Sequence, residues 1–107
     1  MAPDNPIFRA VLALLDQGPV ALQDLPENLQ AGFRMARKDG RLQGFRITVI
    51  EHSMYVYQPQ DRFRAYYLAL AHGVKNGRRA ASAFLARGEY KYHYNGMIIL
   101  LYAGGEW

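Results

Sequence analysis

The sequence contains no cysteine. A disulfide framework and a thiolate metal site are therefore excluded, and nothing indicates an oxidising compartment. The longest apolar run, at 97–103, is far shorter than the ~20 residues that a membrane-spanning helix needs. The segment 1–6 lacks the basic stretch and apolar run of a secretory signal. We therefore expect a cytoplasmic protein with no membrane partner.

Groups for catalysis or metal binding are also scarce. The three histidines, at 52, 72 and 93, have no paired spacing, and the nine acidic residues are scattered along the chain. No Gly-x-Ser-x-Gly segment is present. Paired carboxylates and closely spaced imidazoles are what acid–base catalysis and metal coordination require. We expect no enzyme activity, no bound metal and no cofactor.

Positive charge, by contrast, is concentrated in two segments. The formal net charge is +4, but residues 1–33 sum to −3, residues 34–46 to +4 and residues 62–91 to +6. Segmental positive charge of this kind favours an acidic partner, either nucleic acid or an acidic protein surface.

The first half of the chain contains signals for two helices. Asp4 or Asn5 can cap a helix that has Pro6 in its first turn and Gly18 as its stop. A connector at 20–25 has room for one helical turn. A second helix is expected from Pro26 to about residue 38, with Gly40 as its stop and with Leu29, Phe33 and Ala36 on its apolar face.

Two hairpins and two further helices are expected after residue 44. Apolar and polar residues alternate over 45–57, which predicts a β-hairpin closed at Pro59. A third helix at 61–72 carries Phe63, Tyr66, Tyr67 and Leu70 on its predicted apolar face, and a fourth helix is expected at 78–87. Asn95-Gly96 then predicts a second hairpin with a type I′ turn.

The expected fold class is α+β, with a helix-helix-hairpin order that occurs twice in a single compact domain. Residues 6–58 and 61–103 share this order, which indicates either an internal duplication or convergent helix composition. The apolar periodicity predicts one set of residues that are buried together: Leu12, Leu15, Phe33, Ile47, Val49, Leu70, Phe84, Ile99 and Leu101.

Residues 6–58 resemble a winged-helix domain in their order of elements and in their charge. The resemblance implies that the helix at 26–38 enters the major groove of DNA and that the hairpin at 45–57 is the wing. The connector at 20–25 is shorter than the middle helix of that architecture. The nucleic-acid-binding residues expected in this half are Gln30, Arg34, Arg37, Lys38, Arg41 and Arg46.

These side chains have the chemistry that DNA requires. Long cationic groups contact phosphates, and the Gln30 amide is a candidate for reading a base edge. Positions 30, 34, 37, 38 and 41 fall within one stripe of the helix, opposite its apolar face. The alternative is that the stripe is an ordinary solvated face.

A second basic group, Lys75, Arg78 and Arg79, lies at the expected start of the fourth helix. Backbone N–H groups and the helix dipole favour an anion at such a position. We expect this group either to bind a phosphate or carboxylate, or to form an ordinary exposed loop.

Tyrosines provide a third candidate surface. Tyr90, Tyr92 and Tyr94 occupy alternate strand positions, and Tyr55 and Tyr57 do the same in the first hairpin. Such rows stack on bases or anchor a protein partner, and they also pack the face of a sheet.

Together these features predict a small nucleic-acid-binding regulator, with DNA as the expected target. A palindromic target would imply a homodimer. The alternative is a small phage or mobile-element protein that binds and inhibits a host protein complex without catalysis, as anti-CRISPR proteins do.

Overall fold

The computed structural model of the chain describes residues 5–86, 90–94 and 97–100, and it describes the side chains of residues 5–86. The elements follow one another along the chain as α1 (Pro6–Gln17), β1 (Val20–Ala21), η1 (Leu22–Asp24), α2 (Glu27–Lys38), β2 (Arg46–Ile50), β3 (Ser53–Tyr57), η2 (Pro59–Asp61), α3 (Arg62–Ala71), α4 (Gly77–Phe84), β4 (Tyr90–Tyr94) and β5 (Met97–Leu100).

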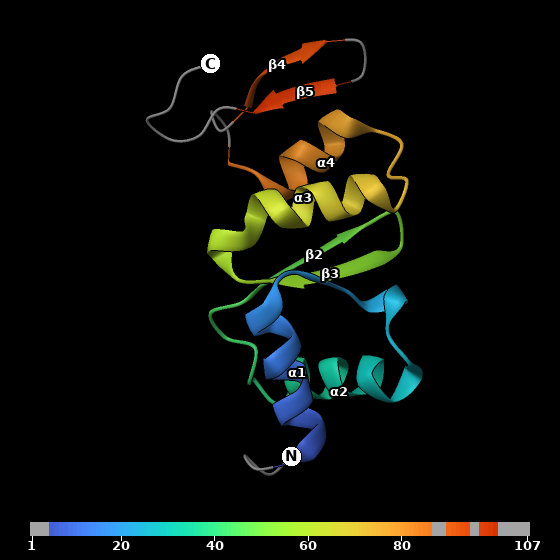
Figure 1. Cartoon of the computed structure of the whole chain (residues 1–107), viewed down its shortest axis with the longest axis vertical. Helices are drawn as coiled ribbons and strands as arrows, with labels where there is room; N and C mark the ends of the chain where they lie inside the picture. The colour runs from blue at the N-terminus through green and yellow to red at the C-terminus, as the bar shows by residue number, and fades with distance from the viewer. Residues whose placement is uncertain (1–4, 87–89, 95–96, 101–107) are drawn as a thin grey trace.

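The elements are stacked in layers (Figure 1). A three-stranded antiparallel sheet with the order β1-β3-β2 forms the middle layer. Helices α1 and α2 cover one face of this sheet, and α3 and α4 cover the other (Figure 1). The β4–β5 hairpin lies beyond α4 (Figure 1). The expected α+β class is therefore confirmed.

The helix ends lie close to where the local sequence predicts them. The Asn5 side chain accepts a hydrogen bond of 2.8 Å from the Ile7 backbone N–H and so caps α1. Gly40 ends α2 with a φ of 73°, and the Arg41 N–H donates to the Ala36 carbonyl at 2.8 Å. Gly73 ends α3 in the same way. Glycine takes this left-handed conformation without a steric penalty, so it fixes both ends.

The connector between α1 and α2 contributes a strand that the sequence did not predict. Leu22–Asp24 forms the expected single turn, as a 3-10 helix. The two residues before it pair with β3, with Val20 opposite Val56. Strand β1 therefore ties the helix pair to the hairpin.

The first hairpin is confirmed and has a two-residue turn. Ile50 lies opposite Ser53, and both central residues have positive φ, 50° at Glu51 and 69° at His52. A positive φ at both positions defines a type I′ turn, which matches the twist of the strands. Neither residue is a glycine or an asparagine, so this turn carries backbone strain.

The second half has shorter elements than expected. Helix α4 ends at Phe84, three residues before the predicted end. Strands β4 and β5 pair antiparallel, and the register shifts between Tyr90 and Tyr92. The predicted Asn95-Gly96 turn lies outside the described residues.

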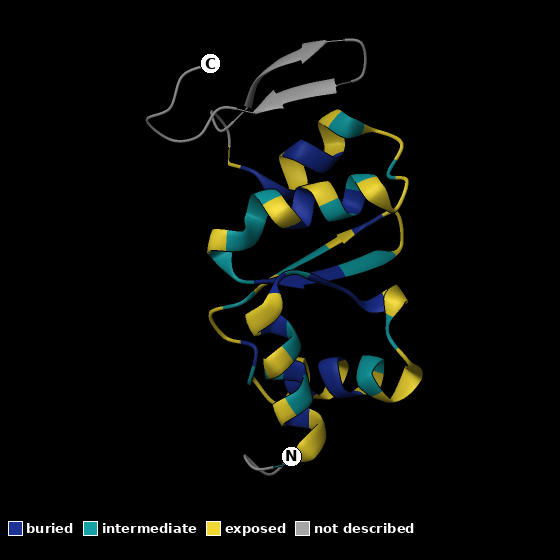
Figure 2. Cartoon of the chain, in the orientation of Figure 1, coloured by how far each residue is buried: buried dark blue, intermediate teal, exposed yellow. Residues whose placement is uncertain are grey.

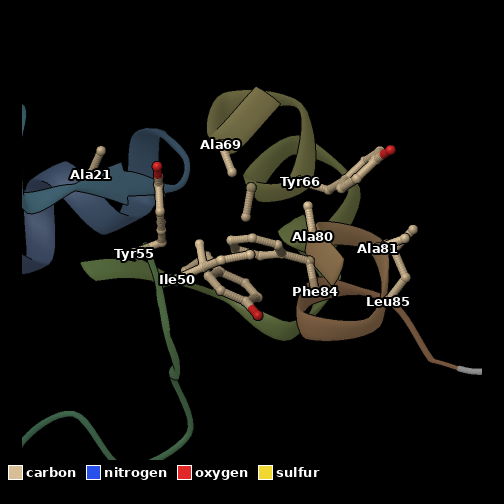
Figure 3. Packing of buried hydrophobic residues seen from close by; sticks show 11 residues of the cluster. Ala21, Ile50, Tyr55, Tyr66, Ala69, Ala80, Ala81, Phe84 and Leu85 are labelled. Carbon is tan, nitrogen blue, oxygen red and sulfur yellow. The ribbon is translucent and has the colours of Figure 1, made fainter. Parts of the chain in front are cut away.

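The sheet separates two hydrophobic cores, because successive side chains of a strand point to opposite faces. Val20 and Val56 face α1 and α2 together with Phe33. Tyr55 and Tyr57 face α3 and α4 (Figure 3). Figure 2 shows buried residues on both sides of the sheet.

The structure therefore corrects the predicted single core. Leu15, Phe33 and Phe84 are buried, but Phe84 lies across the sheet from the other two. Leu12, Ile47 and Leu70 are only half-buried. Val49 is 58% exposed and belongs to neither core, whereas the next residue, Ile50, is buried against α3 and α4. The side chains of Ile99 and Leu101 lie outside the described set.

The predicted apolar face of α3 is largely confirmed: Tyr66 is buried, and Phe63 and Leu70 pack against the same core. Tyr67 is the exception, since it is 55% exposed, whereas Ala65 and Ala69 are fully buried. These alanines belong to the same cluster as Ala80 and Ala81 of α4 (Figure 3). Small side chains let the two helices approach closely, and here the alanines are buried where Tyr67 was expected.

The two halves share a helix pair followed by a hairpin, but they differ between their helices. A strand and a 3-10 turn separate α1 from α2, whereas no strand separates α3 from α4 in this fully described stretch. The internal duplication stays a prediction.

Candidate nucleic-acid interface

The outer face of α2 presents Arg34, Arg37 and Lys38 to solvent. The opposite face of this helix is held in the core by Phe33 and Ala36, which are 1% and 0% exposed. Within residues 5–86, Arg37 and Lys38 form no ion pair. The two cations lie in the last turn of α2, where the helix dipole favours positive charge.

Gln30 belongs to the structure of the connector and does not project freely from α2. Its Nε2 donates a hydrogen bond of 2.8 Å to the Leu25 carbonyl, and its Oε1 accepts one of 3.5 Å from Arg34. Both ends of the amide are therefore engaged. The base-reading role of Gln30 stays a prediction, and it would require the amide to give up its hydrogen bond to the Leu25 carbonyl for one to a base edge.

Arg41 packs back onto the molecule. It is half-buried, and its guanidinium carbon lies 4.9 Å from the centroid of the Phe8 ring. A cation over an aromatic face at this distance is an attractive contact. The structure therefore places Arg41 at the end of α2 as a packing residue, beside the exposed cations but not among them.

The sheet register separates Arg46 from α2. Arg46 lies directly opposite Tyr57, and directly opposite residues of a strand pair project from the same face. Tyr57 faces α3 and α4, so Arg46 also projects from that face, away from α2. Arg46 is exposed, but the structure does not bring it to the α2 surface.

Strand β3 of the predicted wing is covered on both of its faces. Residues of β3 are buried alternately against the two helix pairs, at Val56 on one side and at Tyr55 and Tyr57 on the other. The Glu51–His52 turn remains exposed at its tip. Arg46 and Val49 of β2 are exposed as well, so these residues and the turn are the part of the hairpin that is open to a partner, and the wing stays a prediction.

Tyr55 and Tyr57 are core residues. They are 0% and 1% exposed, and their hydroxyl groups are hydrogen-bonded to Gln23 at 3.4 Å and to Thr48 at 2.7 Å. The expectation that they contact a partner is therefore corrected. The side chains of Tyr90, Tyr92 and Tyr94 lie outside the described set.

The second basic group, Lys75, Arg78 and Arg79, is exposed around the start of α4. Acceptors from the chain itself serve its backbone N–H groups. Asn76 Oδ1 accepts from the Arg79 N–H at 3.0 Å, and Glu51 Oε1 accepts from the Lys75 N–H at 3.3 Å. The chain thus already supplies the capping acceptor and a carboxylate where an anion was expected.

This second group does not extend the α2 surface. It contacts the turn at one end of β2, whereas the end of α2 leads through residues 39–45 to the other end of that strand. The two ends of a five-residue strand are about 13 Å apart, and α2 and α4 lie on opposite faces of the sheet. Within residues 5–86, these two basic groups therefore form separate surfaces.

Sequence reasoning did not single out three further residues on the outer side of α2. Asn28, Ala31 and Met35 are exposed, with Met35 at 53%. Ala31 lies next to Arg34 and Lys38, whereas Asn28 lies on the side toward α1, half a turn around the helix from Arg37. They border a small groove of about 240 Å³ that also includes Ile7 of α1, which is 39% exposed. These positions are three and four residues apart, which is the spacing of neighbours on a helix surface, and this spacing could have identified them from the sequence.

A larger groove of about 590 Å³ lies between the end of α1, β1, the connector and α3. Its walls are mostly apolar, and Arg64 and Asp24 are its charged residues. Arg64 donates to the Gln17 carbonyl at 3.1 Å and pairs with Asp61 at 3.3 Å, and Asp24 contacts His72 at 2.7 Å. The charged groups are thus engaged within the chain, and we assign no ligand to this groove.

Two general features complete the description. None of the helices in the described ranges is both long and apolar enough to cross a membrane. Within the same residues, no three histidine or acidic side chains are grouped so that they could hold a metal ion. Comparison with protein-family models, with curated proteins and with solved structures finds no significant match for this chain.

Proposed function

We propose that this chain binds double-stranded DNA through the outer face of α2. The observation that carries the proposal is the presence of three exposed cations, Arg34, Arg37 and Lys38, on one side of a helix in an outer layer of the fold. A helix of 12 residues is about 18 Å long, and the major groove of DNA is wide enough to admit it.

The adjoining side of α2, toward α1, also carries groups that suit a base-pair edge. Asn28 lies near the start of α2, and an asparagine amide can form two hydrogen bonds with adenine. Ala31 and Met35 add apolar contact of the kind that favours the thymine methyl group. We favour Asn28 over Gln30 for reading a base, because the Gln30 amide is already bonded.

The connection between the helix pair and the sheet supports this role mechanically. Strand β1 pairs with β3, and the hydrogen bond from Gln58 to the Leu15 carbonyl, at 3.0 Å, joins η2 to α1. The helix pair is thus attached to the sheet at two places. Rigid positioning of α2 would let its contacts form without further ordering of the chain.

The experiment is a DNA-binding series at increasing salt concentration. With three phosphate contacts, the logarithm of the binding constant should fall with the logarithm of salt at a slope of about −2.7. Lys38→Ala and Arg37→Ala should each reduce the steepness by about one unit. Arg37→Lys keeps the charge and should keep the slope.

Arg78→Ala is the matched control, because it removes one exposed arginine from the other basic surface. An unchanged slope in this variant, together with reduced slopes in the α2 variants, supports the proposal. A reduced slope in Arg78→Ala alone would move the interface to Lys75, Arg78 and Arg79. Binding that is weak for the wild type, with no slope change in any variant, would contradict DNA binding.

A protein partner is the second candidate function, and the Ile7–Met35 groove favours it. Methionine and arginine are enriched in protein interfaces, and here exposed Met35 lies beside Arg34. The partner would be an acidic protein surface, and the chain would act as a non-enzymatic inhibitor of the anti-CRISPR kind. In that event Met35→Ala should weaken the function, and salt should affect binding only mildly.

A further inference from the structure

His72 joins two parts of the chain that are 48 residues apart. Its Nε2 lies 2.7 Å from Asp24 Oδ2, on the connector, and its Nδ1 lies 2.7 Å from the Leu68 carbonyl oxygen, on α3. Both distances are those of good hydrogen bonds. The imidazole therefore bridges η1 and the last turns of α3 across the edge of the sheet.

Both neighbours of the ring are acceptors. A backbone carbonyl can only accept a hydrogen bond, and the same holds for an ionised carboxylate. A neutral imidazole carries a single N–H, so it can donate to one of these two groups but not to both. Only the imidazolium ion satisfies both contacts at once.

The two partners of His72 are also residues of the larger groove. Asp24 lines it from the connector and Leu68 lines it from α3, and Tyr67 and Leu25 continue the same two walls. The two hydrogen bonds of the ring therefore connect the two walls at this end.

We propose that protonated His72 is a clasp that holds the connector against α3, and that loss of its proton releases the Asp24 side of the groove. This is a conformational device set by pH. It rests on the Asp24–His72–Leu68 geometry and is independent of DNA binding by α2.

The surroundings of His72 support a proton-dependent contact. Among the described residues, the titratable groups that contact the ring are Asp24, from η1, and Tyr55, from β3, whose ring centroid is 6.1 Å away in an edge arrangement. The Tyr55 hydroxyl accepts a hydrogen bond of 3.4 Å from Gln23 Nε2. The His72 side chain is 23% exposed, so solvent protons can reach it.

The hydrogen bond to the Leu68 carbonyl raises the pKa of His72 above its ordinary value, partial burial opposes this, and Asp24 raises the pKa further. A group with a raised folded-state pKa stabilises the fold fully below its unfolded pKa of about 6.5. This stabilisation is lost as the pH rises through the folded pKa of His72. The clasp is therefore closed in mildly acidic solution and weakens toward alkaline pH.

The test is an NMR titration of the full chain that reads the protonation of both His72 ring nitrogens. Asp24→Asn keeps an acceptor next to Nε2 but removes the charge, so it should lower the pKa of His72. In the wild type, the amide signals of Leu25 and Val20, which line the groove, should shift with the same midpoint as His72. In Asp24→Asn this coupled shift should shrink. His52→Gln changes an exposed histidine of the hairpin turn and should leave the His72 titration unchanged.

Chemical denaturation of the wild type, Asp24→Asn, His72→Gln and the double variant gives a second readout. At about pH 5.5, the double-mutant cycle should show that Asp24 and His72 are coupled. The coupling should be about two- to fivefold in the unfolding equilibrium constant, as for exposed ion pairs. At about pH 8.5 this coupling should fall toward onefold. A single protonated ring nitrogen at about pH 5.5, or a His72 pKa that Asp24→Asn leaves unchanged, would overturn the clasp. The clasp would also be overturned if the amide signals of Leu25 and Val20 did not shift while His72 titrates.

Discussion

Tyr55 of β3 and Phe84 of α4 pack edge to face, with ring centroids 5.4 Å apart. Phe84 also contacts Tyr57, at 5.7 Å between centroids. One ring of α4 thus touches two alternate residues of the central strand (Figure 3). Edge-to-face pairs contribute beyond their buried area, so this contact fixes α4 to the sheet.

Truncation of Phe84 should therefore detach the second helix pair from the sheet. We expect Phe84→Ala to lower the free energy of unfolding by about 3–5 kcal/mol, because it removes a buried ring and leaves a cavity. Val49→Ala is the control, since Val49 is 58% exposed, and it should change stability by less than about 1 kcal/mol. Chemical denaturation measures both. Similar effects of the two changes would show that Phe84 does not hold the layers together.

The effect of Gly32→Ala on stability should change sign when Ile7 is replaced by alanine. A Cβ atom at Gly32 would lie 2.4 Å from Ile7 Cγ2, so α2 approaches α1 through the absence of a side chain. We expect Gly32→Ala to destabilise the wild type. In an Ile7→Ala background the clash is gone, and the same change should stabilise by up to about 1 kcal/mol through helix propensity. A double-mutant cycle by thermal unfolding tests this, and additive effects would contradict the close contact.

The Glu51–His52 turn predicts a second steric effect. His52 has a φ of 69°, a conformation that β-branched residues strongly resist and that asparagine tolerates. We expect His52→Val to be less stable than His52→Asn by about 1–2 kcal/mol. Both substitutions remove the same exposed imidazole, so their difference in chemical denaturation isolates the backbone. Equal stabilities would mean that the turn is not type I′.

Stability at high pH should depend on Tyr66. Burial, and then the neighbouring Tyr67, raise the pKa of the Tyr66 hydroxyl above its ordinary value. Because the protonated phenol is favoured in the folded state, the resulting stabilisation is complete below about pH 10 and is lost as the pH rises through the folded pKa.

Tyr66→Phe should therefore flatten the loss of stability above about pH 10, measured by thermal unfolding across an alkaline series. Tyr67→Phe should have a smaller effect, since Tyr67 is the lesser cause of the raised pKa. If Tyr66→Phe still loses stability steeply above about pH 10, other tyrosines cause that loss.

The amino-acid sequence by itself determined the local features of this protein. Asn5, Gly40 and Gly73 mark helix ends because capping and left-handed turns depend on a few adjacent residues. The buried side of α2 was also predictable, because Phe33 and Ala36 recur at helical spacing among polar residues. The exposed cations of the candidate site follow from the same periodicity.

Only the tertiary structure decided which surfaces remain open. Helix α3 has apolar residues around most of its circumference, so its sequence could not choose between Tyr67 and the alanines that pack near α4. Strand β1 is only two residues long, so it is too short to show the alternation of apolar and polar residues that indicates a strand. Its pairing with β3 is a long-range contact. The sheet register and the second helix pair then turned Arg46 away from α2 and buried Tyr55. Contacts between residues distant in sequence, which no local pattern encodes, thus separated the predicted site into two basic surfaces and a hairpin whose β3 strand is buried.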